Sequence, residues 1–148
     1  DIFFIQKITD KKQIEKEMKL IFRNLNLPFE NEFLNSYPNQ LSGGQLQRIS
    51  LARALLLKPK ILICDESVNM LDASVKIEIL KLLRVLQEKM SLTIIFITHD
   101  LGVATKFCDR LLVMNHGKIV DEGISSTIFS KTKSKYTKSL IDTSLNLS

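Results

Sequence analysis

Apolar residues near the start of the chain recur every three or four positions, which is the spacing of an amphipathic helix. The side chains that set this spacing are Ile14, Met18, Ile21, Phe22 and Leu25. They predict a helix from about Lys11 to Leu25, which Pro28 ends. The residues from Phe29 to Gln40 are mostly polar and include a second proline, so we expect a connecting loop there.

A second helix is expected to begin at Ser42, because serine is a favourable residue at the N-cap position. One side of this helix would carry Leu46, Ile49, Arg53 and Leu56. The next segment, Ile61–Cys64, is continuously apolar, which is typical of a strand buried on both faces of a parallel sheet. Two carboxylates, Asp65 and Glu66, follow directly and are therefore expected at the end of a buried strand.

A strand–helix–strand unit is predicted for the middle of the chain. Asp72 is placed to cap its helix. The apolar positions of that helix are Val75, Ile79, Leu82, Leu83 and Leu86. The second strand runs from Leu92 to Thr98, and a right-handed crossover would make the two strands parallel, so that their polar ends meet at one edge of the sheet. We therefore expect Glu66 and His99 to be close neighbours.

The end of the chain predicts several short elements. Asn115–Gly117 has the composition of a tight turn and would join two strands into a hairpin. The elements expected here are a helix from about Leu101 to Phe107, strands at Leu111–Met114 and Lys118–Val120, a short helix starting at Ser125 or Ser126, a helix from about Lys135 to Ile141, and a frayed end from Asp142 to Ser148. Strands that alternate with helices in this way favour an α/β fold.

The 148 residues are 45% hydrophobic and 25% charged, a balance that is typical of a soluble globular domain. No apolar run approaches the roughly 20 residues that cross a bilayer. The start, Asp1–Ile5, has neither a basic leader nor a small-residue cleavage site, so we expect it to lie in the middle of a longer chain. Cys64 and Cys108 lack CxxC or Cys/His ligand spacing, which argues against a disulfide framework or a zinc site and fits a reducing, cytoplasmic setting.

The net charge of +5 raises the question of nucleic acid binding, since lysines gather near the end of the chain. These residues are Lys131, Lys133, Lys135 and Lys138. Runs of this kind are commonly the solvated face of a helix, and the segment lacks the set of aromatic residues that a base-stacking platform requires. We therefore expect no nucleic acid partner.

The residues Ser42, Gly43, Gly44 and Gln45 form a polar turn that opens directly into a helix. Unpaired backbone N–H groups and the positive end of the helix dipole would then point at one spot. Glycines let the backbone approach a phosphate closely, and the serine hydroxyl and glutamine amide add donors. The turn is a candidate anion site, although the same residues taken alone are also an ordinary helix cap.

Asp65, at the end of a buried strand, is placed to hold Mg²⁺ through water, and Glu66 to orient or deprotonate an attacking water. The alternative interpretation is one capping carboxylate and one solvated carboxylate. His99 follows the second strand, where its imidazole could bind a phosphate oxygen that gains charge during transfer, although a single histidine there is commonly structural. His116, in the predicted hairpin turn, has only a structural interpretation.

Four motifs occur in a fixed order along the chain: LSGGQ at Leu41–Gln45, ILICDE at Ile61–Glu66, LD at Leu71–Asp72 and ITHD at Ile97–Asp100. In this order they closely resemble the nucleotide-binding domain of ABC transporters, and the resemblance covers essentially the whole chain. The outer segments resemble the subfamily that drives oligopeptide, dipeptide and nickel import. Those segments are Tyr37–Gln40, Asp109–Arg110, Gly117–Val120 and Tyr136–Leu140.

The resemblance implies part of a P-loop NTPase (RecA-like) core, with a mostly parallel sheet flanked by helices. Residues 1–60 would then belong to the helical subdomain and residues 61–148 to the ATPase core. The implied cofactors are ATP and Mg²⁺. The implied partners are a second ATPase subunit and membrane permeases, at the cytoplasmic face of the cell membrane.

The resemblance also implies a role for each motif residue. The signature residues Ser42, Gly43, Gly44 and Gln45 would contact the γ-phosphate of ATP held by the partner ATPase subunit. Asp65 would lie near Mg²⁺, Glu66 would be the catalytic base, and His99 would sense and stabilise the γ-phosphate. Asp72 would close the D-loop, Asn69–Asp72, which crosses the dimer interface in this family.

The chain departs from the family pattern in four places. Ser67-Val68 replaces the usual Pro-Thr or Pro-Val, and Asn69-Met70 replaces the common Ser-Ala of the D-loop. No G-x-x-x-x-G-K-[ST] sequence is present to grip the β- and γ-phosphates. The family's Q-loop is missing as well, since Gln6 lies too close to the signature to be its glutamine.

These departures leave three interpretations open. The first is an ATPase subunit of an importer for peptides or metal chelates, of which the 148-residue chain alone would be inactive. The second is a non-catalytic or decayed partner protein, which contributes only the surface that carries its signature residues. The third is a soluble ABC-type ATPase that acts on ribosomes or DNA.

Overall fold

The computed structural model describes residues 10–66 and 72–145. The chain divides into two compact units between Ile95 and Phe96, and this boundary falls within a strand, β2.

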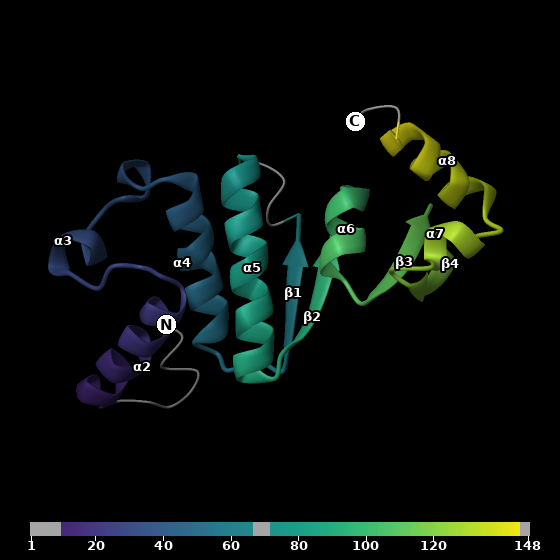
Figure 1. The fold of residues 1–148 in the computed structure, drawn as a ribbon. Helices are drawn as coiled ribbons and strands as arrows, with labels where there is room; N and C mark the ends of the chain where they lie inside the picture. Colours follow the sequence, from purple (N-terminus) through teal and green to yellow (C-terminus); the bar gives the residue numbers. More distant parts are fainter. Residues whose placement is uncertain (1–9, 67–71, 146–148) are drawn as a thin grey trace. The chain divides into compact units, whose positions relative to one another are not determined.

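The first unit contains four helices, one 3₁₀ turn and the strand β1 with the start of β2, within the described residues (Figure 1). Their bounds are α2 Lys11–Asn24, α3 Asn31–Leu34, η1 Pro38–Gln40, α4 Gly43–Leu55, β1 Ile61–Asp65, α5 Ala73–Met90 and β2 Thr93–Ile97. The helices α2, α4 and α5 lie where the apolar spacing predicts them.

The segment from Phe29 to Gln40 is more ordered than the predicted loop, since it holds α3 and η1. Polar side chains stabilise these short turns. The Asn35 Nδ2 donates to the Asn31 carbonyl at 2.7 Å, and the backbone N–H of Tyr37 donates to Gln40 Oε1 at 2.7 Å. The spacing of apolar residues does not reveal such local hydrogen bonds, which explains why only a loop was predicted here.

The strands β1 and β2 are neighbours in one sheet, and their arrows point in the same direction (Figure 1). The backbone N–H of Thr93 donates to the Lys60 carbonyl at 2.9 Å where the pairing begins. Only one face of β1 is buried: Leu62 and Cys64 are buried, whereas Ile61 is 56% exposed and Ile63 63% exposed. The predicted burial on both faces is therefore wrong, because no described element of the first unit covers the face that carries Ile63.

The core of the first unit lies where α4 and α5 run side by side (Figure 1). Its buried helical side chains are Leu51, Ala52 and Leu55 on α4 and Ile79, Leu82, Leu83 and Leu86 on α5. The α5 stripe is the predicted one. On α4 the predicted side is buried only in part, since Leu56 at its C-terminal end is buried, whereas Leu46 is 38% exposed and Arg53 is exposed. The start of α4, the end of β1 and the start of α5 lie at the same end of this unit (Figure 1).

The second unit holds the end of β2 and the elements α6 Leu101–Phe107, β3 Arg110–Asn115, β4 Lys118–Ile124, α7 Ile128–Lys131 and α8 Lys135–Leu145. The strands β3 and β4 form the predicted antiparallel hairpin. Its turn has positive φ angles at His116, 46°, and Gly117, 75°. Such angles at both central residues match the right-handed twist of the flanking strands, and they account for the glycine.

Two element boundaries of the second unit differ from the predictions. The helix α7 begins after Thr127 rather than at Ser125 or Ser126. Ser125 is buried instead, and its hydroxyl donates to the Thr105 carbonyl at 2.6 Å, so it joins α6 to the hairpin. The helix α8 continues to Leu145, so the predicted fraying from Asp142 is wrong for the described residues.

Candidate functional site

The signature turn, Ser42–Gln45, forms the first turn of α4 with a reciprocal cap. Ser42 Oγ accepts from the backbone N–H of Gln45 at 3.2 Å, and Gln45 Oε1 accepts from the backbone N–H of Ser42 at 2.8 Å. The predicted serine cap is therefore confirmed. The N–H groups of Gly43 and Gly44 belong to the first turn and have no acceptor within the helix. Gly43 is also exposed, so this helix end can receive an anion.

The two carboxylates lie at the end of β1, as the apolar run predicts. Asp65 is the last residue of the strand, Glu66 follows it, and both are exposed. Glu66 has a φ of 46°, a left-handed conformation that glutamate rarely adopts. This bend turns the chain sharply out of the strand.

Asp72 is exposed and occupies the N-cap position of α5. Its side chain makes no capping hydrogen bond, so only its position, and not the predicted side-chain cap, is confirmed. Its carbonyl accepts from the backbone N–H of Lys76 at 2.8 Å and so begins the helix. The predicted D-loop residues Asn69–Leu71, together with Ser67 and Val68, lie outside the described residues.

The signature turn, the β1 carboxylates and Asp72 thus gather at one end of the first unit (Figure 1). A helix N-terminus with spare N–H groups supplies donors for phosphate, and an exposed carboxylate can hold a hydrated cation. In this respect the residues present fit a nucleotide with Mg²⁺. Among the described residues no group of three or more histidine, cysteine, aspartate or glutamate side chains could hold a metal ion by itself. Asp65 would therefore act with water and phosphate oxygens as the other ligands.

His99 belongs to the second unit, in the exposed turn between β2 and α6. This turn is held from both sides. The rings of Phe96 and Phe107 meet edge to face at 5.2 Å between centroids, and Asp100 Oδ1 accepts from the backbone N–H of Val103 at 3.0 Å. Since Glu66 lies in the first unit, the expected proximity of Glu66 and His99 stays a prediction.

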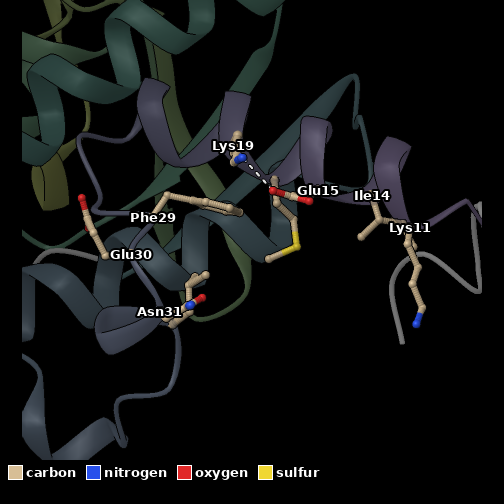
Figure 2. A pocket seen from close by; sticks show the side chains of 9 residues that line it. Lys11, Ile14, Glu15, Lys19, Phe29, Glu30 and Asn31 are labelled. Carbon is tan, nitrogen blue, oxygen red and sulfur yellow. Dashed lines mark ion pairs between the residues drawn. The ribbon is translucent and has the colours of Figure 1, made fainter.

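A groove of about 650 Å³ lies between α2 and the segment that carries α3 (Figure 2). Its residues include Met18, Phe29 and Leu34, and an ion pair joins Lys19 to Glu15 at 2.6 Å. The ammonium of Lys19 also lies 5.5 Å from the centre of the Phe29 ring. None of the predicted site residues lines this groove, so it is separate from the candidate site.

Sequence reasoning missed an ion pair beside the signature turn. Arg48 Nη2 on α4 lies 2.7 Å from Glu78 Oε2 on α5. The two residues are 30 positions apart, and neither belongs to a recognisable motif. Only the packing of α4 against α5 brings them together, so no signal in the sequence could have indicated the pair.

Comparison with known proteins agrees with this arrangement. Residues 3–69 match the family model of ABC transporters. The methionine import ATP-binding protein MetN 1 of Oceanobacillus iheyensis is 41% identical over 146 residues, which are 99% of this chain and 43% of that protein. The oligopeptide transport ATP-binding protein OppF of Haemophilus influenzae is 46% identical over 108 residues, 73% of this chain and 32% of that protein.

A solved structure of the ATP-binding cassette MJ0796, a dimer in a post-hydrolysis state with ADP and Pi, superposes with a TM-score of 0.66. It is 33% identical, and the match covers 80% of this chain and 50% of that one. The chain therefore belongs to the ABC transporter ATP-binding family, with the α/β fold of the P-loop NTPase core. It spans less than half the length of the two import proteins. No helix in the described parts of the chain is long and apolar enough to span a bilayer.

Proposed function

We propose that this chain is part of an ATPase subunit that hydrolyses ATP in a two-subunit sandwich and so drives solute import through membrane permeases. The observation that carries the proposal is the gathering of the signature turn, Asp65–Glu66 and Asp72 at one end of the first unit (Figure 1). The names of the similar proteins, which import methionine and oligopeptides, support an importer. The cargo belongs among small solutes such as amino acids, peptides or metal chelates.

Each residue has a proposed role, which for His99 rests on its motif, Ile97–Asp100, alone. The first turn of α4 would offer the N–H groups of Gly43 and Gly44 and the Ser42 hydroxyl to a γ-phosphate held by the second ATPase subunit. Asp65 would hold the hydration shell of Mg²⁺, an ion that neutralises phosphate charge during transfer. Glu66 would orient the attacking water and accept its proton, and His99 would stabilise the γ-phosphate. Asp72 would contact the second subunit beside its nucleotide.

The proposal also places the subunit at the cytoplasmic face of the membrane, bound to permease subunits. The chain holds no G-x-x-x-x-G-K-[ST] sequence, so the grip on the β- and γ-phosphates must come from outside these 148 residues. The chain alone would therefore supply half of a site and would not turn ATP over.

The decisive variant is Glu66→Gln in the full-length subunit, reconstituted with its permease. Glutamine keeps the size of the side chain but cannot accept a proton, and general-base catalysis commonly contributes about 10²- to 10⁴-fold in rate. We expect ATP turnover to fall by at least about 100-fold. Binding of a fluorescent ATP analogue should stay unchanged, since the Glu66 carboxylate is not a phosphate ligand.

The matched control is Glu88→Gln, an exposed carboxylate on α5 away from the site. It should hydrolyse ATP at the wild-type rate. A Glu66→Gln subunit that also turns over at the wild-type rate would remove Glu66 from the role of base. A wild-type subunit that binds ATP but never hydrolyses it would favour the non-catalytic partner instead.

A further inference from the structure

The helices α4 and α5 run side by side (Figure 1), and they pack closely at the ends that carry the candidate site. A Cβ atom added to Gly44 would lie 2.9 Å from Val75 Cγ1, nearer than real Cβ contacts allow. Gly44 belongs to the signature turn, and Val75 lies in the first turn of α5, three residues after Asp72. The glycine thus sets the distance between the signature turn and the start of α5.

One turn further along both helices, the ion pair of Arg48 and Glu78 joins them again. The Arg48 side chain is only 19% exposed, whereas that of Glu78 is 63% exposed. Arg48 Nε is buried and has no hydrogen-bond partner among the described residues. An apolar side chain could fill this space without leaving a donor unpaired, so stability alone does not account for the arginine. Only the arginine end of this pair is largely shielded from water, and an ion pair that joins two helices at one place can fix their register.

We propose that Arg48 and Glu78 are positioning residues that fix α4 in register with α5, so that the signature turn and Asp72 meet the second ATPase subunit as one rigid body. The inference rests on the proposed function. Neither side chain belongs to the signature turn or to the strand-end carboxylates; they act through the elements that carry those groups. Donors for a phosphate must be held to within a fraction of an ångström, and a misplacement of about 1 Å can lower a rate by 10²-fold.

The test uses the full-length protein, assembled with its second ATPase subunit and permease, and the variant Glu78→Ala. Because Glu78 is largely exposed, its removal should leave the melting temperature close to that of the wild type. We expect kcat for ATP hydrolysis to fall on the order of tenfold, while the KM for ATP stays within about twofold. The matched control is Glu88→Ala, an exposed glutamate of the same helix without an ion pair in the part of the chain that the structure describes.

A second pair of variants separates positioning from simple packing. Arg48→Lys keeps the charge and should recover a large part of the turnover that Arg48→Ala loses. In the Glu78→Ala background, Arg48→Ala should add little further loss, since both changes break one interaction. Additive losses, or a fall in kcat that only follows a fall in melting temperature, would overturn the inference.

ATP turnover by the wild-type assembly distinguishes a failure of the proposed function from a failure of the positioning role. If the wild-type assembly hydrolyses ATP and the Glu78→Ala assembly does so at the same rate, only the positioning role is overturned. A wild-type assembly that does not hydrolyse ATP overturns the proposed function and this inference with it.

Discussion

At the scale of single residues, the backbone of Glu66 has a conformation that opposes local stability. Its φ of 46° lies in the left-handed region, which raises the free energy of an L-residue by about 1–2 kcal/mol relative to glycine. The same bend ends β1 and presents the carboxylate to solvent beside Asp65. Strained backbone of this kind is concentrated at functional sites, which supports the role proposed for Glu66.

A prediction follows for substitutions at position 66. Glu66→Gly should be more stable than Glu66→Ala by about 1 kcal/mol, because glycine adopts the left-handed conformation without strain. Both variants lose the same side chain, so their difference isolates the backbone. Urea denaturation of the full-length protein measures it. Equal midpoints for the two variants would mean that the bend relaxes once the glutamate is removed.

At the scale of elements, the cap of α4 has two tasks that substitutions can separate. Ser42 caps the helix through its hydroxyl, and the same hydroxyl is proposed to face the phosphate of the partner subunit. Aspartate caps a helix about as well as serine does and interacts favourably with the helix dipole. Its fixed negative charge, however, would repel a phosphate.

We therefore expect Ser42→Asp to keep its unfolding free energy within a few tenths of a kcal/mol of the wild type. Its ATP turnover should fall by at least about tenfold, since a stabilising donor becomes a repelling charge. Ser42→Ala, the comparison variant, should lose about 1 kcal/mol of stability. Thermal melts and steady-state turnover on the same preparations test both parts, and full turnover in Ser42→Asp would place the phosphate elsewhere.

The elements themselves were predicted best where a single apolar stripe is present. In α5 the buried residues Ile79, Leu82, Leu83 and Leu86 form one such stripe, and the sequence indicates it correctly. In α4, apolar residues occur on several sides, and the partner helix decides that Leu51, Ala52 and Leu55 are buried. The spacing of apolar residues alone cannot show which side of α4 is buried, because it does not identify the surface against which the helix packs.

The places of the candidate residues along the elements were predictable for a different reason. Ser42–Gln45, Asp65–Glu66 and His99 each lie at or next to the end of a regular element, so the ends of helices and strands locate them. The order of the motifs along the chain then indicates the family. The contacts that support the turn were not predictable, since Gly44 meets Val75, and Arg48 meets Glu78, only through tertiary packing.

At the scale of the whole molecule, the one-sided burial of β1 leaves apolar surface in contact with water. Ile61 is 56% exposed and Ile63 63% exposed on the same face of the strand. In the hairpin of the second unit, Leu112 and Met114 are similarly exposed, at 58% and 59%. Exposed apolar faces on sheets favour association with other chains.

We expect the isolated 148-residue chain to self-associate, and Ile63→Thr to weaken that association. Threonine keeps the β-branched shape but removes apolar surface worth roughly 1–2 kcal/mol when buried, which corresponds to about a tenfold rise in the dissociation constant. Sedimentation velocity at several concentrations measures the change, with the exposed polar Thr93→Ser as control. A wild-type chain that remains monomeric at every concentration would contradict the expectation.

The exposed isoleucines also bear on the calorimetry of the chain. The heat capacity increment of unfolding comes mainly from apolar surface that becomes hydrated, and for globular proteins it is about 12–15 cal/mol/K per residue. Ile61 and Ile63 are already hydrated in the folded monomer, so they add little to that increment. Unfolding of a self-associated chain, in which these side chains are covered, should therefore show a slightly larger increment than unfolding of the monomer.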